Sequence, residues 1–393
     1  MLSVVCDGRP LQPGYKLHLE RGIGRYAKHL LSEFYDLLGP EHLSVLVRDN
    51  LPDPELPLDI PRLAVGYAPG WLPIGKRLIS EHLLSKRRLA DAWRLGRPVH
   101  FFSHLDAPAR PGSPTVVTVH DLIAQRLKHL YLEDKSPLRF NLERWLETRC
   151  LGRARAIIAD SQATKRDVVE LYGVDPAIIE VVYLAVSPQL RPVDDPARVA
   201  EVLGRHGLAG GEPFFFYVGG IDQRKDLGSL LEALAILREQ GLAHRLALAG
   251  KIKQDKQYPK LRAAVERLGL QESVRELGFV EDQDLPALFT ATAGFVYPSL
   301  YEGFGLPPLE AMACGAPVVA VGSSSVPEVV GDAGWLVPPG DAAALAEAMA
   351  ALLTQPGAAD DLRDRGRRRA ASFSWQRAAQ SVLAIYREVA GEP

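Results

Sequence analysis

Residues 298–319 read PSLYEGFGLPPLEAMACGAPVV, a stretch that predicts a fixed succession of structural elements. It follows the short apolar run 294–297, which is typical of a buried strand. Pro307 and Pro308 suit the first turn of a helix, and Gly315 suits the C-terminal cap before the next apolar run. A strand, a glycine-rich loop, a helix and a second strand in this order indicate a parallel α/β sheet.

Two glutamates in this stretch are candidate ligand-binding residues: Glu302 in the loop and Glu310 in the predicted first turn of the helix. Sheets of this kind bind ligands beyond the carboxyl ends of their strands, where both glutamates would stand. Gly303 and Gly305 would let a bulky ligand approach the backbone closely. Taken alone, Glu310 could equally complement the helix dipole, and Glu302 could be a solvated surface charge.

The alternation of strands and helices extends over most of the chain, which predicts two doubly wound, Rossmann-like α/β domains. Apolar runs predict strands at 2–7, 44–48, 99–102, 115–120, 156–159, 179–182, 214–219, 245–249, 274–277, 294–297 and 317–321. Amphipathic patterns predict helices at 25–38, 161–171, 227–240 and 258–268. The segment 187–196, SPQLRPVDDP, has three prolines and no periodicity, so we interpret it as a linker between domains 1–186 and 197–373.

Composition excludes several classes of protein. The 393 residues include 46 Lys and Arg and 48 Asp and Glu, so no bulk basicity points to nucleic acid. Three cysteines, Cys6, Cys150 and Cys314, lack the spacing of a disulfide framework or a structural zinc site. The sequence shows neither a signal peptide nor a transmembrane run, so we expect a cytoplasmic protein.

A second candidate site follows the predicted strand 214–219. The double glycine Gly219-Gly220 is followed by the adjacent cations Arg224 and Lys225. An arginine supplies a planar fork and a lysine a compact charge, a combination that suits a diphosphate. The alternative is a solvated turn that leads into a helix.

Gly22 and Gly24 form G-x-G-x-x-A with Ala27, which is formally a dinucleotide-binding fingerprint. That fingerprint requires the first glycine directly after the first strand, whereas Gly22 lies well beyond Asp7. A helix that starts near Arg25 would add a dipole that favours an anion such as a phosphate. Plain helix-start chemistry and NAD binding stay as alternatives.

His120 follows the predicted strand 115–120 at its carboxyl end, with Asp121 next in the chain. A single histidine at a strand end can be a structural hydrogen-bonding residue or part of a ligand site. Spacing alone does not separate the two interpretations, and Asp121 could orient the imidazole or cap the next helix.

Together these segments resemble the retaining glycosyltransferases of family 4, which have the GT-B fold with a central cleft between two domains. The stretch from Glu302 to Val319 is similar to the E-x7-E motif of that family. The segments that also match, in order, are GIGRYAKHLL (22–31), VHDL (119–122), ADSQATKRDV (159–168), YVGGIDQRKDLGSLLEA (217–233), LGFV (277–280) and FSWQRAAQSVLAIY (373–386). The last of these resembles a C-terminal helix, 374–393, that returns to the first domain.

The resemblance implies a role for each candidate residue in binding a nucleotide-sugar donor. Catalytic roles fall to His120, Glu302, Arg224 and Lys225: the cations would bind the donor diphosphate, and Glu302 and His120 would contact the sugar. Glu310 would hold the ribose. The remaining donor-binding residues would be Gly22, Gly24, Gly219, Gly220, Phe279, Val280, Gly303, Phe304, Gly305 and Leu306, with Phe279-Val280 as the turn that contacts the base.

The resemblance therefore implies a metal-independent retaining hexosyltransferase without a cofactor, because cationic side chains would take the place of Mg²⁺ beside the diphosphate. GDP-mannose is the expected donor, and a saccharide or lipid-linked saccharide, bound by the first domain, is the expected acceptor. The alternatives are a GT-B disaccharide phosphorylase or synthase and a non-catalytic sugar-binding protein.

One weaker signal concerns membranes. Residues 71–97 contain seven Lys and Arg against Glu81 and Asp91, together with Trp71. A basic, partly amphipathic stretch of this kind could rest on anionic lipid at the inner face of a membrane, or it could be a solvated helix.

Overall fold

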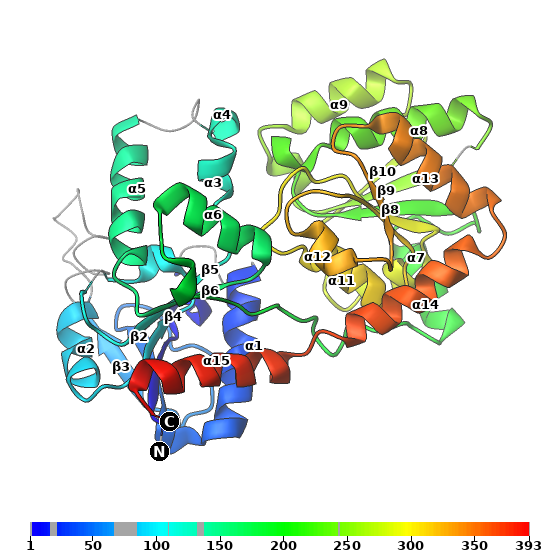
Figure 1. Cartoon of the computed structure of the whole chain (residues 1–393). Coiled ribbons are helices and arrows are strands. Elements are labelled where there is room, and N and C mark those ends of the chain that lie inside the picture. Colours follow the sequence, from blue (N-terminus) through cyan, green and yellow to red (C-terminus); the bar gives the residue numbers. More distant parts are fainter. Residues whose placement is uncertain are drawn as a thin grey trace. The chain divides into compact units, whose positions relative to one another are not determined.

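The computed structural model describes residues 2–15, 22–66, 85–108, 110–131, 137–242 and 244–392, with backbone alone at 131, 137–140, 142 and 143. It forms two compact units (Figure 1). Unit 1 comprises Met1–Leu184 and Ser374–Pro393, and unit 2 comprises Ala185–Phe373. The segment 187–196 lies in unit 2, and its last residue, Pro196, opens a helix.

Unit 1 is built on a seven-stranded parallel sheet with the order β3-β2-β1-β4-β5-β6-β7. The strands are β1 (Val4–Asp7), β2 (Leu43–Arg48), β3 (Arg62–Val65), β4 (Val99–Phe101), β5 (Thr115–Val119), β6 (Ala156–Ala159) and β7 (Ile179–Val181). Every residue of β1, β4, β5 and β6 is buried, as expected for strands covered on both faces.

The helices of unit 1 are α1 (Gly22–Leu38), α2 (Ser85–Arg94), α3 (Ile123–Arg126), α4 (Lys128–Tyr131), α5 (Pro137–Leu151), α6 (Gln162–Tyr172) and α15 (Trp375–Ala390). Helix α15 follows unit 2 in the chain but packs on α1 of unit 1, where the rings of Trp375 and His29 stack 4.8 Å apart. Its buried face includes Tyr386, whose hydroxyl contacts Cys6 of β1 and His100 of β4.

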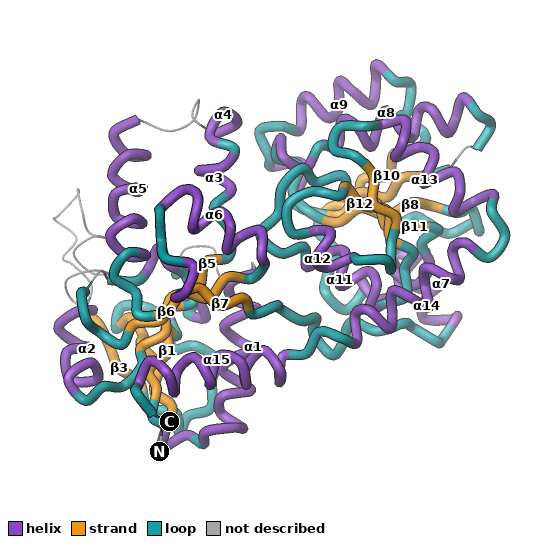
Figure 2. Tube along the Cα trace, viewed as in Figure 1, coloured by secondary structure: helices purple, strands orange, loops and turns teal. Residues whose placement is uncertain are grey.

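Unit 2 has a six-stranded parallel sheet with the order β10-β9-β8-β11-β12-β13. Its strands are β8 (Phe214–Val218), β9 (Arg245–Ala249), β10 (Val274–Gly278), β11 (Gly294–Tyr297), β12 (Val318–Val321) and β13 (Trp335–Val337). Figure 2 shows the strands of each unit in orange, with helices on both faces. The helices here are α7 (Pro196–Arg205), α8 (Leu227–Glu239), α9 (Tyr258–Arg267), α10 (Leu285–Ala291), α11 (Leu306–Ala313), α12 (Val326–Val330), α13 (Ala342–Thr354) and α14 (Ala358–Ala371).

The two parallel sheets confirm the predicted fold class, and each of the eleven predicted strands overlaps an observed one. The sequence did not predict β3 and β13, which are short, partly exposed strands at sheet edges. Two helix starts also differ from expectation. Helix α1 begins at Gly22 rather than near Arg25, and α11 begins at Leu306, which places Glu310 beyond the first turn.

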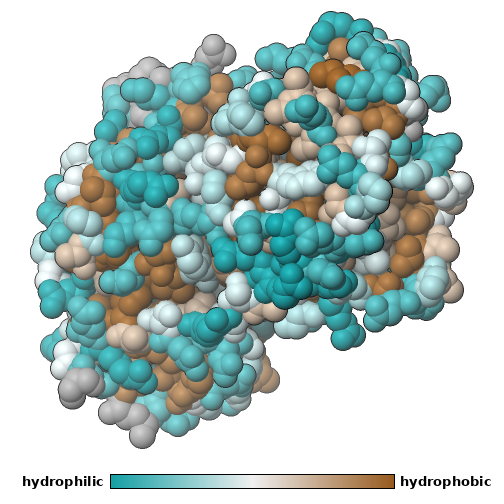
Figure 3. Space-filling view, turned by 45° about the vertical axis from the view of Figure 1, so that its right-hand side comes forward, coloured by the Kyte–Doolittle hydropathy of each residue, from teal (hydrophilic) through white to brown (hydrophobic). Residues whose placement is uncertain are grey.

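Within the described residues, no helix combines the length and the apolar composition needed to cross a bilayer. On the face drawn in Figure 3, apolar residues occur in separate groups among polar ones.

Candidate functional site

The centre of the unit 2 sheet is a topological switch point. Strands β8 and β11 lie side by side, yet β9 and β10 continue on one side of this pair and β12 and β13 on the other. The loops that follow β8 and β11 therefore diverge and leave a crevice at the carboxyl ends of the strands. Arg224 and Lys225 follow β8, and Glu302 follows β11. The topology thus brings the two predicted sets of residues to one place.

These three side chains are in direct contact. Oε1 of Glu302 accepts hydrogen bonds from Nη1 of Arg224 and Nζ of Lys225, both at 2.6 Å, and from the hydroxyl of Ser299. All three bonds end on the same carboxylate oxygen. Lys225 also donates to the Tyr297 hydroxyl at 2.9 Å, so these contacts account for two of the three N–H groups of its ammonium.

The cluster is buried, which strengthens the attraction between its opposite charges. Lys225 is 7% exposed and Glu302 is 8% exposed. Burial by itself would raise the pKa of Glu302, but the cations of Lys225 and Arg224 outweigh burial and hold that pKa at about 2. Glu302 therefore stays ionised at neutral pH and acts as the counter-ion of both cations.

Glycines bring the loops after β8 and β9 close together. Gly219 has φ of +154°, a conformation that side-chain-bearing residues rarely adopt, and Gly220 continues the turn. A Cβ placed on Gly250 would lie 2.1 Å from the Gly219 carbonyl oxygen. Neither loop could pack this way with a larger residue at 250.

The loop that carries Glu302 leads directly into α11. Gly305 precedes the helix with φ of +109°, after Gly303 and the buried Phe304, and Leu306 is its first residue. Glu310 lies on this helix and is 7% exposed. The helix N-terminus and the Glu302 carboxylate are thus only a few residues apart.

Three consecutive serines after β12, which the sequence suggests as possible caps of the next helix, hold this loop. Ser323 donates to the carbonyl of Leu300 at 2.7 Å, and Ser325 donates to the carbonyls of Glu302 at 3.0 Å and Phe304 at 2.7 Å. The hydroxyl of Ser324 accepts a hydrogen bond from the backbone N–H of Glu302 at 2.8 Å. No local sequence pattern announces these bonds, because they depend on β11 and β12 being neighbours.

Phe279 and Val280 follow β10 at the same edge of the sheet. Val280 is buried, whereas Phe279 is 57% exposed. The ammonium of Lys251, in the loop after β9, lies 5.1 Å from the centre of the Phe279 ring. The exposed ring is therefore a flat apolar surface beside a cation.

In unit 1, His120 has acceptors on both of its ring nitrogens. Nδ1 donates to Oδ2 of Asp160 at 2.6 Å, and Nε2 donates to the carbonyl of Phe102 at 2.7 Å. Both bonds form together only when the imidazole carries two protons. Burial disfavours that charge, but the Asp160 carboxylate and the Phe102 carbonyl outweigh it and raise the pKa of His120. The partner Asp160 was not predicted, since it lies forty residues away in the sequence.

The glycines predicted for unit 1, Gly22 and Gly24, lie in the first turn of α1 and not in a loop. Residues 16–21, which precede this helix, lie outside the described residues. His120, Gly22 and Gly24 belong to unit 1, whereas all the other predicted site residues belong to unit 2.

The switch point of unit 1, between β1 and β4, contains a buried ion pair that the sequence analysis also missed. Arg9, only 1% exposed, donates to both carboxylate oxygens of Asp7, at 2.6 and 2.8 Å, and to the carbonyl of Asp106 at 3.2 Å. Its guanidinium also lies over the rings of Tyr15 and Phe101. The sequence signal for this pair was the segment Asp7-Gly8-Arg9, which begins at the last residue of the first strand.

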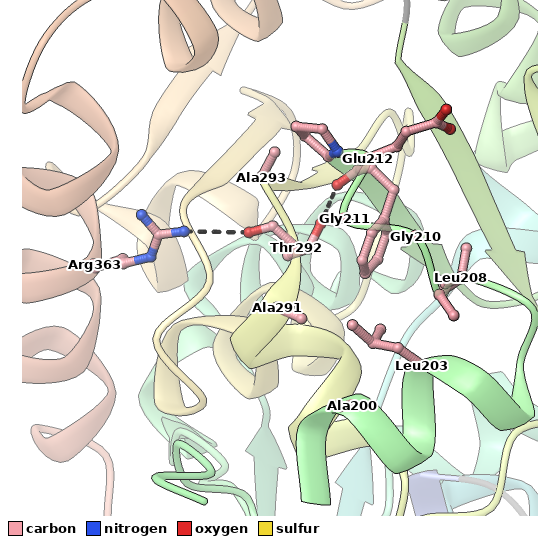
Figure 4. Close-up of a pocket in the computed structure, with 13 residues that line it drawn as sticks. Ala200, Leu203, Leu208, Gly210, Gly211, Glu212, Ala291, Thr292, Ala293 and Arg363 are labelled. Carbon is pink, nitrogen blue, oxygen red and sulfur yellow. Dashed lines mark hydrogen bonds between the residues drawn. The ribbon is translucent and has the colours of Figure 1, made fainter. Parts of the chain in front are cut away.

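A cavity of about 440 Å³ lies at the amino-terminal side of the unit 2 sheet, near the start of β8 (Figure 4). It is lined mainly by small and apolar residues of α7, the turn 208–213 and residues 291–293. Arg363 reaches toward it and donates to the Thr292 carbonyl at 3.3 Å. None of the predicted site residues lines this cavity.

The residues that the structure describes contain no group of three or more His, Cys, Asp and Glu side chains arranged to hold a metal ion. The charged groups gathered at the unit 2 switch point include two cations and the carboxylate of Glu302, and the Asp222 carboxylate lies 3.3 Å from Nε of Arg224. Such a set can bind an anion through its cations and a hydroxyl through its carboxylate.

Two sequence-family models match the chain in succession. The model described as "Glycosyltransferase Family 4" matches residues 21–190, and the one described as "Glycosyl transferases group 1" matches residues 200–369. The first match falls largely in unit 1 and the second lies in unit 2.

Curated relatives extend these matches over nearly the whole chain. The O-antigen chain mannosyltransferase B of Escherichia coli is 31% identical over 375 residues, which cover 93% of this chain and 96% of the relative. The α-maltose-1-phosphate synthase of Mycobacterium tuberculosis is 30% identical, with 70% of this chain and 73% of the relative covered.

Among solved structures, WaaG, a glycosyltransferase involved in lipopolysaccharide biosynthesis, superposes with a TM-score of 0.72 at 18% identity, covering 97% of this chain and 99% of that one. HepE of Anabaena in complex with UDP and glucose gives a TM-score of 0.70 at 21% identity, covering 98% and 99%. At these identities the likeness concerns the fold.

Proposed function

This chain belongs to glycosyltransferase family 4 and has the GT-B fold, and from this premise we propose that its donor is a nucleotide diphosphate sugar. As a member of that family it is a retaining hexosyltransferase. We propose mannose, carried by GDP, as the sugar, because the E. coli relatives are named as mannosyltransferases. The proposed acceptor is a saccharide or lipid-linked saccharide bound by unit 1.

The observation that carries the proposal is the contact of Arg224, Lys225 and Glu302 at the switch point of unit 2. A diphosphate offers oxygens to the two cations, and a sugar hydroxyl suits the carboxylate. Oε2 of Glu302 takes part in none of the three bonds that end on Oε1, and we assign it to the donor sugar.

The other proposed donor contacts lie at the same edge of the sheet, where the strands have their carboxyl ends. Backbone N–H groups at Gly303–Leu306 stand at the start of α11, where a helix favours anions. Glu310, one turn further along this helix, suits the ribose hydroxyls, because a carboxylate can accept from a vicinal diol. Phe279 and Val280 would contact the base, and Gly219-Gly220 would leave room for the phosphates.

In the proposed reaction, the bond between the anomeric carbon and the diphosphate oxygen breaks, and its electron pair goes to that oxygen. The acceptor oxygen forms the new bond on the same face of the sugar, and its proton passes to the leaving phosphate. Arg224 and Lys225 stabilise the negative charge that develops on the diphosphate. Positioning and charge therefore supply the catalysis, without an enzyme nucleophile.

The hydrogen bonds of His120 bear on the contact with the donor sugar that the family resemblance implies. The Nε2–H group of His120 donates to the Phe102 carbonyl in this structure, and it can instead donate a hydrogen bond to a sugar hydroxyl. We therefore assign His120 to sugar binding as a hydrogen-bond donor.

The basic stretch 71–97 falls partly outside the described residues, but 85–97 is described and includes α2. Arg87 and Arg88 are exposed on that helix. We propose that this helix rests on anionic lipid at the cytoplasmic face of a membrane. Binding to phosphatidylglycerol vesicles that is lost in Arg87→Glu/Arg88→Glu and absent with phosphatidylcholine would support this; equal binding by both proteins would contradict it.

The proposed donor is tested by calorimetry of the purified protein with GDP, UDP and ADP, followed by transfer assays with the matching sugars. Lys225→Ala should weaken binding of the preferred nucleotide diphosphate about tenfold or more, since it removes a buried cation from the phosphate site. Arg262→Ala, which removes an exposed cation of α9, is the matched control.

Activity in excess EDTA belongs to the same test, because Arg224 and Lys225 are assigned the role of a metal. Full transfer is expected; loss of transfer that Mg²⁺ restores would contradict that assignment. Release of nucleotide diphosphate separates a transferase from a phosphorylase. Binding without any release would indicate a sugar-binding protein.

A further inference from the structure

Two non-glycine residues among those described have a left-handed backbone: Asp226 with φ of +46° and Ser324 with φ of +48°. This conformation is uncommon for a residue with a side chain and is retained where the surrounding structure requires it. Both residues lie at the carboxyl end of the unit 2 sheet. Asp226 directly follows Lys225, and Ser324 follows β12.

The conformation of Asp226 has a local explanation. It is the N-cap of α8, where its carboxylate accepts from the backbone N–H of Ser229 at 3.4 Å and from the hydroxyl of Ser229 at 2.7 Å. Aspartate also tolerates this region better than most residues do. Ser324 has no such role, because the N-cap of the next helix, α12, is Ser325.

The contacts of the serine triplet explain Ser324 instead. In an extended chain, successive side chains point to opposite faces, so three consecutive residues could not all reach one loop. Here the left-handed Ser324 is followed by Ser325 with φ of −87° and ψ of −14°, and the chain curls. As a result, all three hydroxyls contact the loop between Leu300 and Phe304.

Within this triplet, Ser324 differs in what it binds. Ser323 and Ser325 donate to carbonyl oxygens, whereas Ser324 accepts from the N–H of Glu302 itself. Glu302 is thus held at its N–H by Ser324, at its carbonyl by Ser325 and at its carboxylate by Arg224 and Lys225. Ser324 therefore fixes the backbone N–H of Glu302, the residue whose carboxylate contacts Arg224 and Lys225.

We propose that Ser324 is a positioning residue of the transfer reaction, which fixes the backbone of Glu302 so that its carboxylate stays at the donor phosphate site. This inference rests on the donor site proposed above and adds a residue to it. The left-handed backbone at 324 places this hydroxyl at the Glu302 N–H.

The test compares Ser324→Gly with Ser323→Ala. Glycine adopts the left-handed backbone without strain, so Ser324→Gly removes the hydroxyl and keeps the turn. The control Ser323→Ala removes a bond to Leu300 and leaves Glu302 untouched. We expect Ser324→Gly to lower kcat about tenfold while the Kd for nucleotide diphosphate changes less than threefold, and Ser323→Ala to change kcat less than threefold.

A double-mutant cycle decides whether the effect passes through Glu302. If it does, Ser324→Gly should cause no further loss of kcat when added to Glu302→Gln. An equal loss in both backgrounds, or wild-type kcat in Ser324→Gly, would overturn the inference.

A crystal structure of Ser324→Gly without donor gives a readout that is independent of turnover. We expect the distance between Oε1 of Glu302 and Nζ of Lys225 to increase from 2.6 Å. An unchanged distance would overturn the inference even if the wild-type protein transferred no sugar. A wild-type protein that binds no nucleotide diphosphate would instead contradict the proposed donor site.

Discussion

Glu302 and Glu310 lie eight residues apart in the sequence, but the structure gives them different surroundings. Glu302 bridges two cations through one oxygen, whereas Glu310 lies on α11. In the proposed donor site, a phosphate would compete with the Glu302 carboxylate for Arg224 and Lys225. Replacing its charge therefore removes one counter-ion from both cations, while Asp222 still pairs with Arg224.

This arrangement predicts opposite effects for two matched substitutions. Glu302→Gln should bind free nucleotide diphosphate as tightly as the wild type or a few times more tightly, and should transfer sugar at least tenfold more slowly. Glu310→Gln should weaken nucleotide diphosphate binding by about 1–3 kcal/mol, the effect of losing a charge-assisted hydrogen bond. Calorimetry and transfer kinetics on both variants check this, and equal losses of nucleotide affinity would contradict it.

At the same scale, His120 and Asp160 predict a pH-dependent stability. The folded-state pKa of His120 is raised, so its charge contributes stability that is complete below the unfolded-state pKa of about 6.5 and is lost as pH rises through the folded-state value. Three other titratable groups interact with His120: Asp121, Tyr26 and His100.

Asp160→Asn should therefore destabilise the protein at pH 6, by up to about 3 kcal/mol for a broken buried ion pair, and less at higher pH. Urea unfolding at pH 6 and pH 9 measures this. The control is Asp175→Asn, an exposed helix cap in the same unit. A loss of stability that is the same at both pH values would contradict the charged imidazole.

How far the sequence predicts each residue depends on how local its contacts are. That Arg224, Lys225 and Glu302 lie near one another was predictable, because each stands in a loop after a strand and carboxyl ends of parallel strands meet at one edge. Their mutual ion pairs were not predictable, since these link residues 77 and 78 positions apart. The contacts of Asp160 with His120 and of Ser324 with Glu302 were not predicted for the same reason.

At the scale of elements, α15 is fixed to unit 1 by a chain of buried polar groups. His100 of β4 lies between the Tyr386 hydroxyl, 2.5 Å from its Nδ1, and the Thr118 hydroxyl, 2.7 Å from its Nε2. Thr118 in turn contacts the Tyr26 hydroxyl of α1 at 3.0 Å. Burial, followed by the charge of His120, lowers the pKa of His100 to about 3, so this histidine stays neutral.

Tyr386→Phe leaves Nδ1 of the buried His100 without this partner, and we expect it to reduce the free energy of unfolding by about 1–3 kcal/mol. Tyr258→Phe, which removes a hydroxyl that bonds Glu276 nearer the surface of unit 2, is the control. Differential scanning calorimetry checks both variants. An equal, small effect in both would mean that the buried chain adds nothing to the docking of α15.

The elements that the sequence predicted well are those whose burial follows from their own residues. Runs such as Phe214–Val218 are apolar throughout and need no partner to be recognised as strands. By contrast, β13 has only three residues, two of them partly exposed or exposed, so its pairing with β12 and not its composition defines it.

At the scale of the whole molecule, unit 2 contains every predicted residue of the donor site except Gly22, Gly24 and His120. A fragment of residues 185–373 should therefore fold alone and bind nucleotide diphosphate within about tenfold of the full chain, because the sheet and the cations remain together. Calorimetry and circular dichroism of the fragment test this. A folded fragment that does not bind would show that unit 1 supplies a major part of the nucleotide affinity.

The position of α15 also has a consequence for how a cell makes the protein. Unit 1 begins at the N-terminus, yet its last helix is translated after all of unit 2, and the contact between Cys6 and Tyr386 joins residues 380 positions apart. On the ribosome, unit 2 can fold while the first 184 residues still lack the helix that covers part of their sheet. Assembly of unit 1 therefore waits until α15 has been translated, and chaperones that shield exposed apolar surface should associate with the nascent N-terminal half.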